Sequence, residues 1–183
     1  VGGGVYMNAG CHGGDWAEVV ERVTVVDMTG ADSVLDRAAV PFTYRRSGLE
    51  GRIILEAVVR LRREEQARLD QETAEMFEWR QRGTPFNQPC GGSVFKNPSG
   101  PSWNREGGPR TAGQLIEAAG LKGRRVGGVE VSPVDGNYFV NTGSATAADV
   151  RALIDLAQRE VEARFGVRLE PEVKVIGASG SWA

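Results

Sequence analysis

The chain has 183 residues, of which 25% are charged and 40% hydrophobic, and its formal net charge is -2. This length and apolar content are sufficient for one or two small soluble domains with a packed core. The slightly acidic charge, without a long basic run, argues against nucleic acid or a membrane surface as a partner, and no apolar run reaches the roughly 20 residues of a membrane-spanning helix.

Glycine dominates the first block of the chain, VGGGVYMNAGCHGGDW (1–16). Glycines at this density let the backbone approach a ligand closely and direct N–H groups at an anion. A mobile loop is the alternative, although the apolar run Val5 to Met7 weighs against it. Because the block carries neither an initiator Met nor a signal-like core, we expect the chain to begin inside a structural unit of a longer protein.

Two apolar segments of the first half predict strands. Residues 18–28 are rich in valine, and residues 52–61 (RIILEAVVRL) are apolar enough to be buried on both faces for part of their length. Between them, Pro41 and Gly48 punctuate the segment PFTYRRSG. This segment is expected to be a loop.

The pattern then changes to a helical period. Leu69, Met76 and Phe77 recur at helical spacing among charged residues, which predicts an amphipathic helix over 64–82. Gly83 and the prolines after it end this helix and lead into PCGGSVFKNPSGP (89–101), where only residues 93–95 could form a strand. That segment is suited to holding a hydroxyl and a cation near a ligand.

The second half contains two well-marked helix starts. Thr111 with Gln114, and Thr146 with Asp149, have the spacing of capping boxes. The predicted elements after the polar loop 99–110 are a helix from 111 to 120, short strands at 126–131 and 138–140, a helix from 146 to 164 and a final strand at 169–180. The order of elements indicates an α+β fold in two parts, divided near residues 83–89.

Generic catalytic motifs are absent from the sequence, including HExxH, paired CxxC, the phosphate-binding P-loop and GxSxG. His12 is the only histidine and the two cysteines, Cys11 and Cys90, are far apart, so neither a metal centre nor a disulfide framework is expected. Isolated polar groups remain, and each alone has an ordinary explanation as a surface or edge-strand residue. They are Asn8, Tyr44, Arg45, Ser93, Lys96, Asn97 and Glu172.

Several segments in this order resemble the signature segments of the UDP-N-acetylenolpyruvoylglucosamine reductase family. They are VGGGVYMNAGCHG, YRRS, GGSVFKNP, AGLKGRRVGG, FVNTGSATAADV and FGVRLEPEVKVIG. The resemblance covers nearly the whole chain but lacks the family's N-terminal flavin-binding portion. It implies part of a vanillyl-alcohol-oxidase/PCMH-type FAD-binding region at 1–82, to which a final strand at 170–183 returns, and a C-terminal α/β substrate-binding domain at 83–169. The predicted strand 52–61 runs directly into the helix at 64–82, as in the shorter, second type of the family.

The resemblance also implies a reaction in the cytoplasm. NADPH reduces FAD, and the reduced flavin passes hydride to UDP-N-acetylglucosamine enolpyruvate to give UDP-N-acetylmuramate for peptidoglycan. Arg45 matches the family's catalytic arginine, which offsets the charge that develops on the substrate carboxylate. Glu172 matches the glutamate that hydrogen-bonds the enolate, and Ser93 matches the proton donor to carbon.

Further residues are implied to bind ligands. Lys96, Asn97, Tyr44 and Arg80 are expected to bind substrate. The backbone of Gly2, Gly3, Gly4, Asn8, Ala9 and Gly10 is expected to line the flavin, with Ile54 packing nearby.

Two other functions stay open at this point. One is another FAD oxidoreductase of the same superfamily, which would not need Ser93, Lys96 and Asn97 together. The other is a nucleotide-sugar-binding fragment without flavin. The sequence does not indicate an oligomeric state.

Overall fold

The computed structural model describes residues 1–98, 108 and 111–174, and it divides the chain into two compact units, Val1–Met76 and Phe77–Ala183. It confirms the α+β class. Most of the predicted loop 99–110, and the predicted final strand beyond residue 174, lie outside the described residues. None of the helices in the described part of the chain has the length and apolar composition to cross a membrane.

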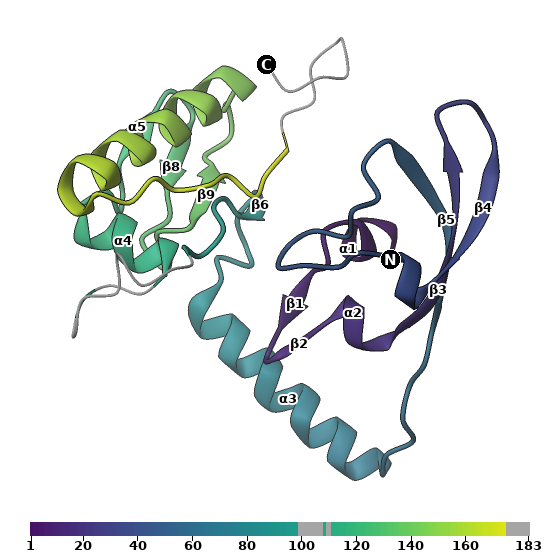
Figure 1. Cartoon of the computed structure of the whole chain (residues 1–183). Coiled ribbons are helices and arrows are strands. Elements are labelled where there is room, and N and C mark those ends of the chain that lie inside the picture. Colours follow the sequence, from purple (N-terminus) through teal and green to yellow (C-terminus); the bar gives the residue numbers. More distant parts are fainter. Residues whose placement is uncertain (99–107, 109–110, 175–183) are drawn as a thin grey trace. The chain divides into compact units, whose positions relative to one another are not determined.

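The first unit is built on an antiparallel sheet in the order β4-β3-β5 (Figure 1). Its elements are α1 (Gly2–Tyr6), β1 (Gly10–Cys11), β2 (Gly14–Asp15), α2 (Trp16–Val19), β3 (Val20–Asp27), β4 (Asp32–Asp36), a 3-10 turn (Arg37–Ala39) and β5 (Arg52–Val59). The glycine-rich block, for which a mobile loop was the alternative, forms a short helix and a small hairpin. The two strands predicted over 18–28 and 52–61 are confirmed as β3 and β5.

The core of the first unit lies on one side of this sheet. Val23 and Val25 of β3 are buried together with Val5 of α1 and Leu49. The opposite side is open, since Ile53 and Leu55 are 58% and 60% exposed. The prediction that this strand is buried on both faces is therefore wrong, because β5 is an edge strand and its core contacts come from one face only.

The long helix α3 (Gln66–Gly83) forms where the periodicity predicts a helix over 64–82. None of its residues is buried, and Phe77 is 55% exposed. Ion pairs between residues one turn apart lie on its surface, such as the pair of Arg68 with Glu72 at 2.8 Å. Such pairs and the good helix formers in the segment support the helix locally. The boundary between the two units falls inside α3.

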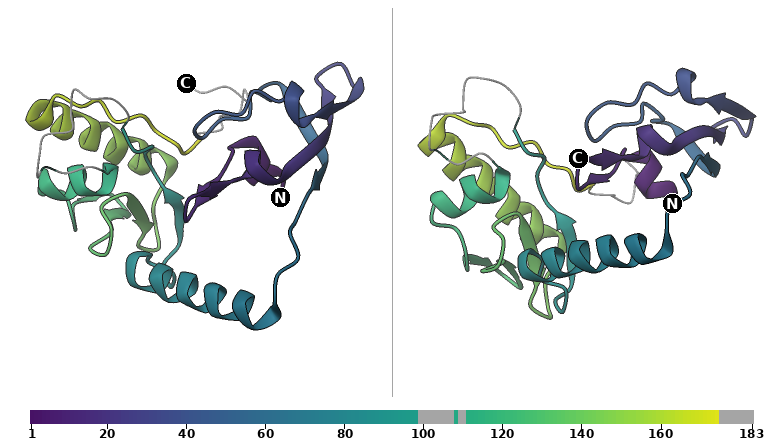
Figure 2. Two further views of the ribbon diagram at one scale, coloured as in Figure 1. Left: turned by 60° about the horizontal axis from the view of Figure 1, so that its bottom comes forward. Right: turned by 90° about the horizontal axis from the view of Figure 1, so that it is seen from below.

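The second unit packs two helices on one face of an antiparallel sheet in the order β6-β9-β8-β7 (Figures 1 and 2). Its elements are β6 (Cys90–Ser93), α4 (Ala112–Ala118), β7 (Arg125–Val126), β8 (Val129–Val131), β9 (Tyr138–Asn141) and α5 (Ala147–Phe165). The core between the two layers includes Phe95, Leu115, Val131 and Leu153, each at most 1% exposed.

Both predicted capping boxes are confirmed. The Thr111 hydroxyl accepts from the Gln114 amide at 3.2 Å, and the Thr146 hydroxyl accepts from the Asp149 amide at 3.1 Å. In each case the side chain of the third residue accepts from the amide of the capping threonine in return. Gly166, with φ of 69°, ends α5 in the left-handed conformation that favours glycine.

The strand predicted over 126–131 is instead a hairpin of β7 and β8. Gly127 and Gly128 form its turn, and Gly127 has φ of 52°. A Cβ on Gly127 would lie 2.3 Å from the carboxylate of Asp149, so the turn packs tightly on the start of α5. The prediction joined the two strands because valines lie on both sides of the glycines, although a Gly-Gly pair between short apolar segments is typical of a two-residue hairpin turn.

Candidate functional site

Ser93 is the last residue of β6, directly after a bulge. Cys90 pairs with Val140 and Ser93 with Tyr138, so β6 has one residue more than β9 over this stretch. Gly92 has φ of 85°, a conformation that costs a residue with a side chain about 1–2 kcal/mol. The glycine before Ser93 is therefore required by the bulge that orients the half-buried serine.

The chain after Ser93 is fixed by Asn137, which is 7% exposed. The side-chain oxygen of Asn137 accepts from the Phe95 amide at 2.9 Å, and its nitrogen donates to the Phe95 carbonyl at 2.8 Å. The Asn137 carbonyl accepts from the Val94 amide at 2.8 Å. One side chain thus continues the β-ladder for a further residue, and it holds the backbone that leaves Ser93.

On its other side this segment pairs with residues 170–173. The Glu172 amide donates to the Val94 carbonyl at 2.7 Å, and the Lys96 amide donates to the Glu170 carbonyl at 2.9 Å. Phe95 and Pro171 form an antiparallel bridge. The backbone of Glu172 therefore lies beside the residue that follows Ser93, and the structure brings these two predicted catalytic residues together within the second unit.

The resemblance implies a final strand at 170–183 that returns to the first domain, and only residues 170–174 of it are described. The described part has a single bridge in place of a regular strand, and it pairs with the second unit. Pro171 lacks the N–H group that a longer ladder requires, which accounts for the short pairing.

Lys96 and Asn97, both predicted substrate ligands, are engaged within the second unit. The Lys96 ammonium lies 2.5 Å from a carboxylate oxygen of Glu170. The side-chain oxygen of Asn97 accepts from the Ala112 amide at 3.0 Å and so caps the start of α4. Asn97 thereby connects the loop after Ser93 to a helix, while its side chain stays exposed.

Arg45, the predicted catalytic arginine, lies in the first unit in a tight turn. Thr43 and Arg46 are bridged by two backbone hydrogen bonds, with Tyr44 and Arg45 between them. Arg45 has φ of 57°, which few residues other than glycine, asparagine and aspartate adopt. Its guanidinium donates to the Gly10 carbonyl at 2.9 Å and lies 4.9 Å from the ring centre of Tyr44.

The turn is anchored to α1 through Ser47, which is 1% exposed. The Ser47 hydroxyl donates to the Tyr6 carbonyl at 2.7 Å and accepts from the Leu49 amide at 3.3 Å. Strain in a turn persists only where the surroundings fix it, and this anchor supplies part of that constraint.

Asn8 connects three segments of the first unit and is 2% exposed. Its side-chain nitrogen donates to Asp15 and to the Thr43 carbonyl, both at 3.0 Å, and its oxygen accepts from the Ala17 amide at 3.0 Å. The amides of Asn8 and Ala9 donate to carbonyls of α1. Asn8 therefore organises the glycine-rich block from inside.

Different constraints explain why glycine occupies the individual positions of this block. A Cβ on Gly4 would lie 2.6 Å from the indole nitrogen of Trp16, and one on Gly10 would lie 2.8 Å from the Gly14 carbonyl and 3.1 Å from the Arg45 guanidinium. Gly2 and Gly3 have open space beside them. Close packing therefore explains Gly4 and Gly10, whereas Gly2, Gly3 and Gly13 have open space at the Cβ position.

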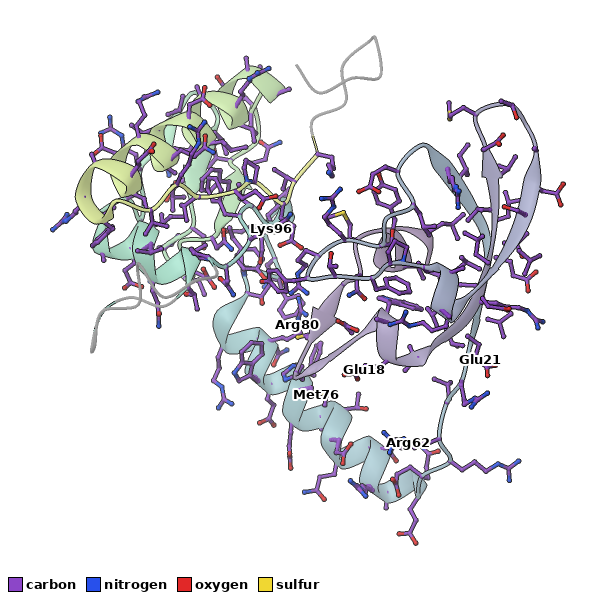
Figure 3. All side chains as sticks on the ribbon, viewed as in Figure 1. Glu18, Glu21, Arg62, Met76, Arg80 and Lys96 are labelled. Atoms are coloured by element: carbon purple, nitrogen blue, oxygen red, sulfur yellow. The ribbon has the colours of Figure 1, made fainter. Side chains whose placement is uncertain are left out.

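The other predicted residues are placed as follows. Tyr44 is 51% exposed, and Ile54 of β5 packs against the core of the first unit. Arg80 lies on α3, in the turn before its end at Gly83 (Figure 3). Because Arg45 and Tyr44 belong to one unit and Ser93, Lys96, Asn97 and Glu172 to the other, the predicted residues form two groups, one in each unit.

Three polar residues were missed by sequence reasoning. Asn137 and Glu170 hold the segment after Ser93, and Asp15 accepts from Asn8 while its other carboxylate oxygen is buried with no hydrogen-bond partner among the described residues. Glu170 carried a signal, since it lies two residues before Glu172 in the motif LEPEV. In the part of the chain that is described, no three His, Cys, Asp or Glu side chains form a possible metal site.

These features define an α+β protein of two units, whose second unit holds a serine and a glutamate on adjacent paired segments. Residues 84–176 match the family described as UDP-N-acetylenolpyruvoylglucosamine reductase, C-terminal domain. The chain belongs to the UDP-N-acetylenolpyruvoylglucosamine reductase family.

Similar proteins cover the first unit as well. UDP-N-acetylenolpyruvoylglucosamine reductase 2 of Symbiobacterium thermophilum is 45% identical over 179 residues, which is 97% of this chain and 55% of that protein. The reductase of Bacillus pumilus is 36% identical over 180 residues, 97% of this chain and 56% of that protein. The chain thus spans little more than half the length of these curated relatives.

A solved structure supports the fold across both units. The crystal structure of UDP-N-acetylenolpyruvylglucosamine reductase from Thermus caldophilus matches with a TM-score of 0.78 at 35% sequence identity. The match covers 95% of this chain and 59% of that one.

Proposed function

We propose that the protein to which this chain belongs reduces UDP-N-acetylglucosamine enolpyruvate to UDP-N-acetylmuramate, with NADPH as reductant and FAD as carrier, in the cytoplasmic synthesis of peptidoglycan precursors. The observation that supports the proposal is the backbone hydrogen bond from the Glu172 amide to the carbonyl of Val94, the residue after Ser93. Family membership supports the same reaction.

The second unit supplies the proton and part of the charge stabilisation. Hydride addition at the methylene carbon of the enolpyruvyl group leaves negative charge on the neighbouring carbon and its carboxylate. Ser93 donates its hydroxyl proton to that neighbouring carbon, and Glu172 in its protonated form hydrogen-bonds the enolate oxygens. A serine is a weak acid, so its placement by the bulge and by Asn137 matters more than its acidity.

Arg45 supplies the positive charge from the first unit. A guanidinium can bind a carboxylate through two parallel hydrogen bonds, and its charge stabilises the enolate more than the neutral double bond. The turn between Thr43 and Arg46 holds the Arg45 backbone in a strained conformation, as is common for residues at functional sites.

The first unit fits a flavin at the start of α1. Gly2 and Gly3 leave open space beside the backbone, which suits the close approach of a ligand such as FAD. The amides of Asn8 and Ala9 are used internally and Gly10 is closely packed, so these three residues shape the loop. When bound, FAD carries hydride from NADPH to the substrate.

The finer assignments follow from this function. Residues 1–82 form part of a vanillyl-alcohol-oxidase/PCMH-type FAD-binding region, with Ile54 near the flavin, and residues 83–169 form the substrate-binding domain. Tyr44, Arg80 and Asn97 contribute to substrate binding. β5 ends at Val59 and α3 begins at Gln66, which supports the shorter, second type of the family.

The full-length protein provides the test. We expect it to purify yellow and to oxidise NADPH faster when UDP-N-acetylglucosamine enolpyruvate is added. A colourless protein that binds the nucleotide sugar would favour the flavin-free binding function. A yellow protein that oxidises NADPH without any response to this substrate would favour another FAD oxidoreductase.

Ser93→Ala tests the role of the serine. We expect reduction of FAD by NADPH to proceed at the wild-type rate, and the substrate half-reaction to slow by about 10²–10⁴-fold because the carbon loses its proton donor. Stopped-flow absorbance of the flavin measures the two half-reactions separately. Equal losses in both would refute the assignment.

A further inference from the structure

The ion pair between Lys96 and Glu170 joins the two segments that carry the predicted catalytic residues. Lys96 follows Ser93 by three residues, and Glu170 precedes Glu172 by two. Their side chains meet at 2.5 Å, and the Lys96 amide donates to the Glu170 carbonyl at 2.9 Å. The same two residues are therefore joined through both side chain and backbone.

The two partners are buried to very different extents. The Lys96 side chain is only 14% exposed, whereas that of Glu170 is 70% exposed. A largely buried ammonium needs a partner, because removal from water disfavours its charge unless a carboxylate or another acceptor compensates. Glu170 provides that partner from the adjacent segment.

The pairing between the segments is otherwise sparse. Pro171 has no amide to donate, and the backbone contacts beside it are those of Lys96 with Glu170 and of Glu172 and Val173 with Val94. With so few backbone bonds over the described residues, the side-chain ion pair becomes a substantial part of what holds the two segments in register.

We propose that Glu170 is a positioning residue, whose ion pair with Lys96 keeps Ser93 and Glu172 aligned for protonation of the substrate carbon. The inference rests on the proposed function and deepens it. It also reassigns Lys96: the lysine acts through Glu170 and does not serve as a free cation for the substrate diphosphate or carboxylate.

Substitution in the full-length enzyme separates these two roles for Lys96. We expect Glu170→Gln and Lys96→Met each to lower the rate of the substrate half-reaction by about 10–100-fold, because small displacements of catalytic groups have effects of this size. The KM for UDP-N-acetylglucosamine enolpyruvate should change by less than about threefold, and FAD reduction by NADPH should keep its rate. The double variant should be no slower than the slower single variant, since one interaction is lost in all three.

Glu117→Gln is the matched control. It breaks another lysine–glutamate pair of the second unit, in which the Lys122 ammonium lies 2.9 Å from Glu117. We expect this variant to keep the wild-type rate in both half-reactions. The unfolding temperature of Glu170→Gln should lie within a few degrees of that of this control, and such a result would exclude a general loss of structure.

Exchange of the two charges gives the sharpest outcome. The double variant Lys96→Glu with Glu170→Lys restores an ion pair of reversed polarity. Its substrate half-reaction should therefore be at least tenfold faster than that of Lys96→Glu alone or of Glu170→Lys alone. Glu170→Asp, which keeps the charge, should also retain more activity than Glu170→Gln.

Defined results would overturn the inference. A lower KM in Glu170→Gln would show that Glu170 competes with the substrate for Lys96, and a failure of both the exchange and Glu170→Asp to recover activity would show that the pair does not position the site. An unchanged rate in Glu170→Gln would also reject it. Failure of the proposed function is distinguishable, because it would remove substrate-dependent turnover from the wild-type protein itself.

Discussion

Arg45 combines a strained backbone with the charge proposed to stabilise the enolate. Its φ of 57° is a conformation that glycine adopts freely and that costs other residues about 1–2 kcal/mol. The hydrogen bond from its guanidinium to the Gly10 carbonyl offsets part of this cost. A residue that is unfavourable for the turn is retained, and such strain is common at functional sites.

Two substitutions of Arg45 separate stability from function. We expect Arg45→Gly to be about 1 kcal/mol more stable than Arg45→Ala, because only the alanine keeps the strain. Both should slow the substrate half-reaction by about 10²–10³-fold, since both remove the guanidinium. Urea unfolding measures the first effect and stopped-flow kinetics the second.

The neighbouring Arg46 serves as the control, because it does not have a positive φ. The Arg46→Ala variant should be more stable than the Arg46→Gly variant, which is the reverse of the order expected at Arg45. If glycine and alanine rank in the same order at both positions, the backbone conformation of Arg45 is not the cause.

Sequence reasoning at this scale proposed residues for the chemistry and missed residues that hold the backbone. Ser93, Arg45 and Glu172 were proposed because they match motifs of the family. Asn137 and Glu170 act through the geometry of a segment distant in sequence, so no local pattern identifies them as partners of residues 94–96.

The elements that the sequence predicts well are those with local signals. α4 and α5 begin at capping boxes, and α3 follows an uninterrupted helical period. The sequence placed a strand at 93–95 in place of β6 and joined β7 and β8 into one strand. The limits of these strands depend on glycines in left-handed conformations and on pairing with other strands. Helix ends are encoded locally, whereas strand ends depend on a distant partner.

The start of α5 makes the stability of the second unit depend on pH. Hydrogen bonding to its carboxylate lowers the pKa of Asp149 below its ordinary value. The Thr146 amide contributes most, followed by the Thr146 hydroxyl and the Gly128 amide. A carboxyl whose pKa is lower in the folded state stabilises that state above its unfolded pKa of about 3.9. The contribution is lost as the pH falls through the folded-state value.

Asp149→Asn should therefore remove part of the acid sensitivity of this unit. We expect the variant to be less stable than the wild type at pH 7, and the difference to shrink as the pH falls from about 4 toward 2. Urea unfolding followed by circular dichroism at several pH values measures it. Asp155→Asn, on the exposed side of α5, controls for the loss of a negative charge. A difference that stays constant with pH would contradict the assignment to Asp149.

The described residues form two hydrophobic clusters, and each cluster lies within one unit. One cluster surrounds Val23 and Leu49, and the other surrounds Leu115 and Leu153. The sequence predicts two parts divided near residues 83–89. The compact units divide between Met76 and Phe77 inside α3, and the family match begins at residue 84, close to the predicted division.

Because the clusters are separate, damage to one core should leave the other intact. Leu49 and Leu153 are matched residues that are 1% and 0% exposed, and truncation of a buried leucine to alanine costs about 2–5 kcal/mol. We expect Leu49→Ala to accelerate amide hydrogen exchange in β3 and β5 alone, and Leu153→Ala to do so in β8, β9 and α5 alone. Leu69→Ala, at a residue of α3 that is 42% exposed, should accelerate exchange in neither set. Mass spectrometry of peptides from each unit would reveal the pattern, and acceleration in both units by either core variant would show that they fold as one cooperative body.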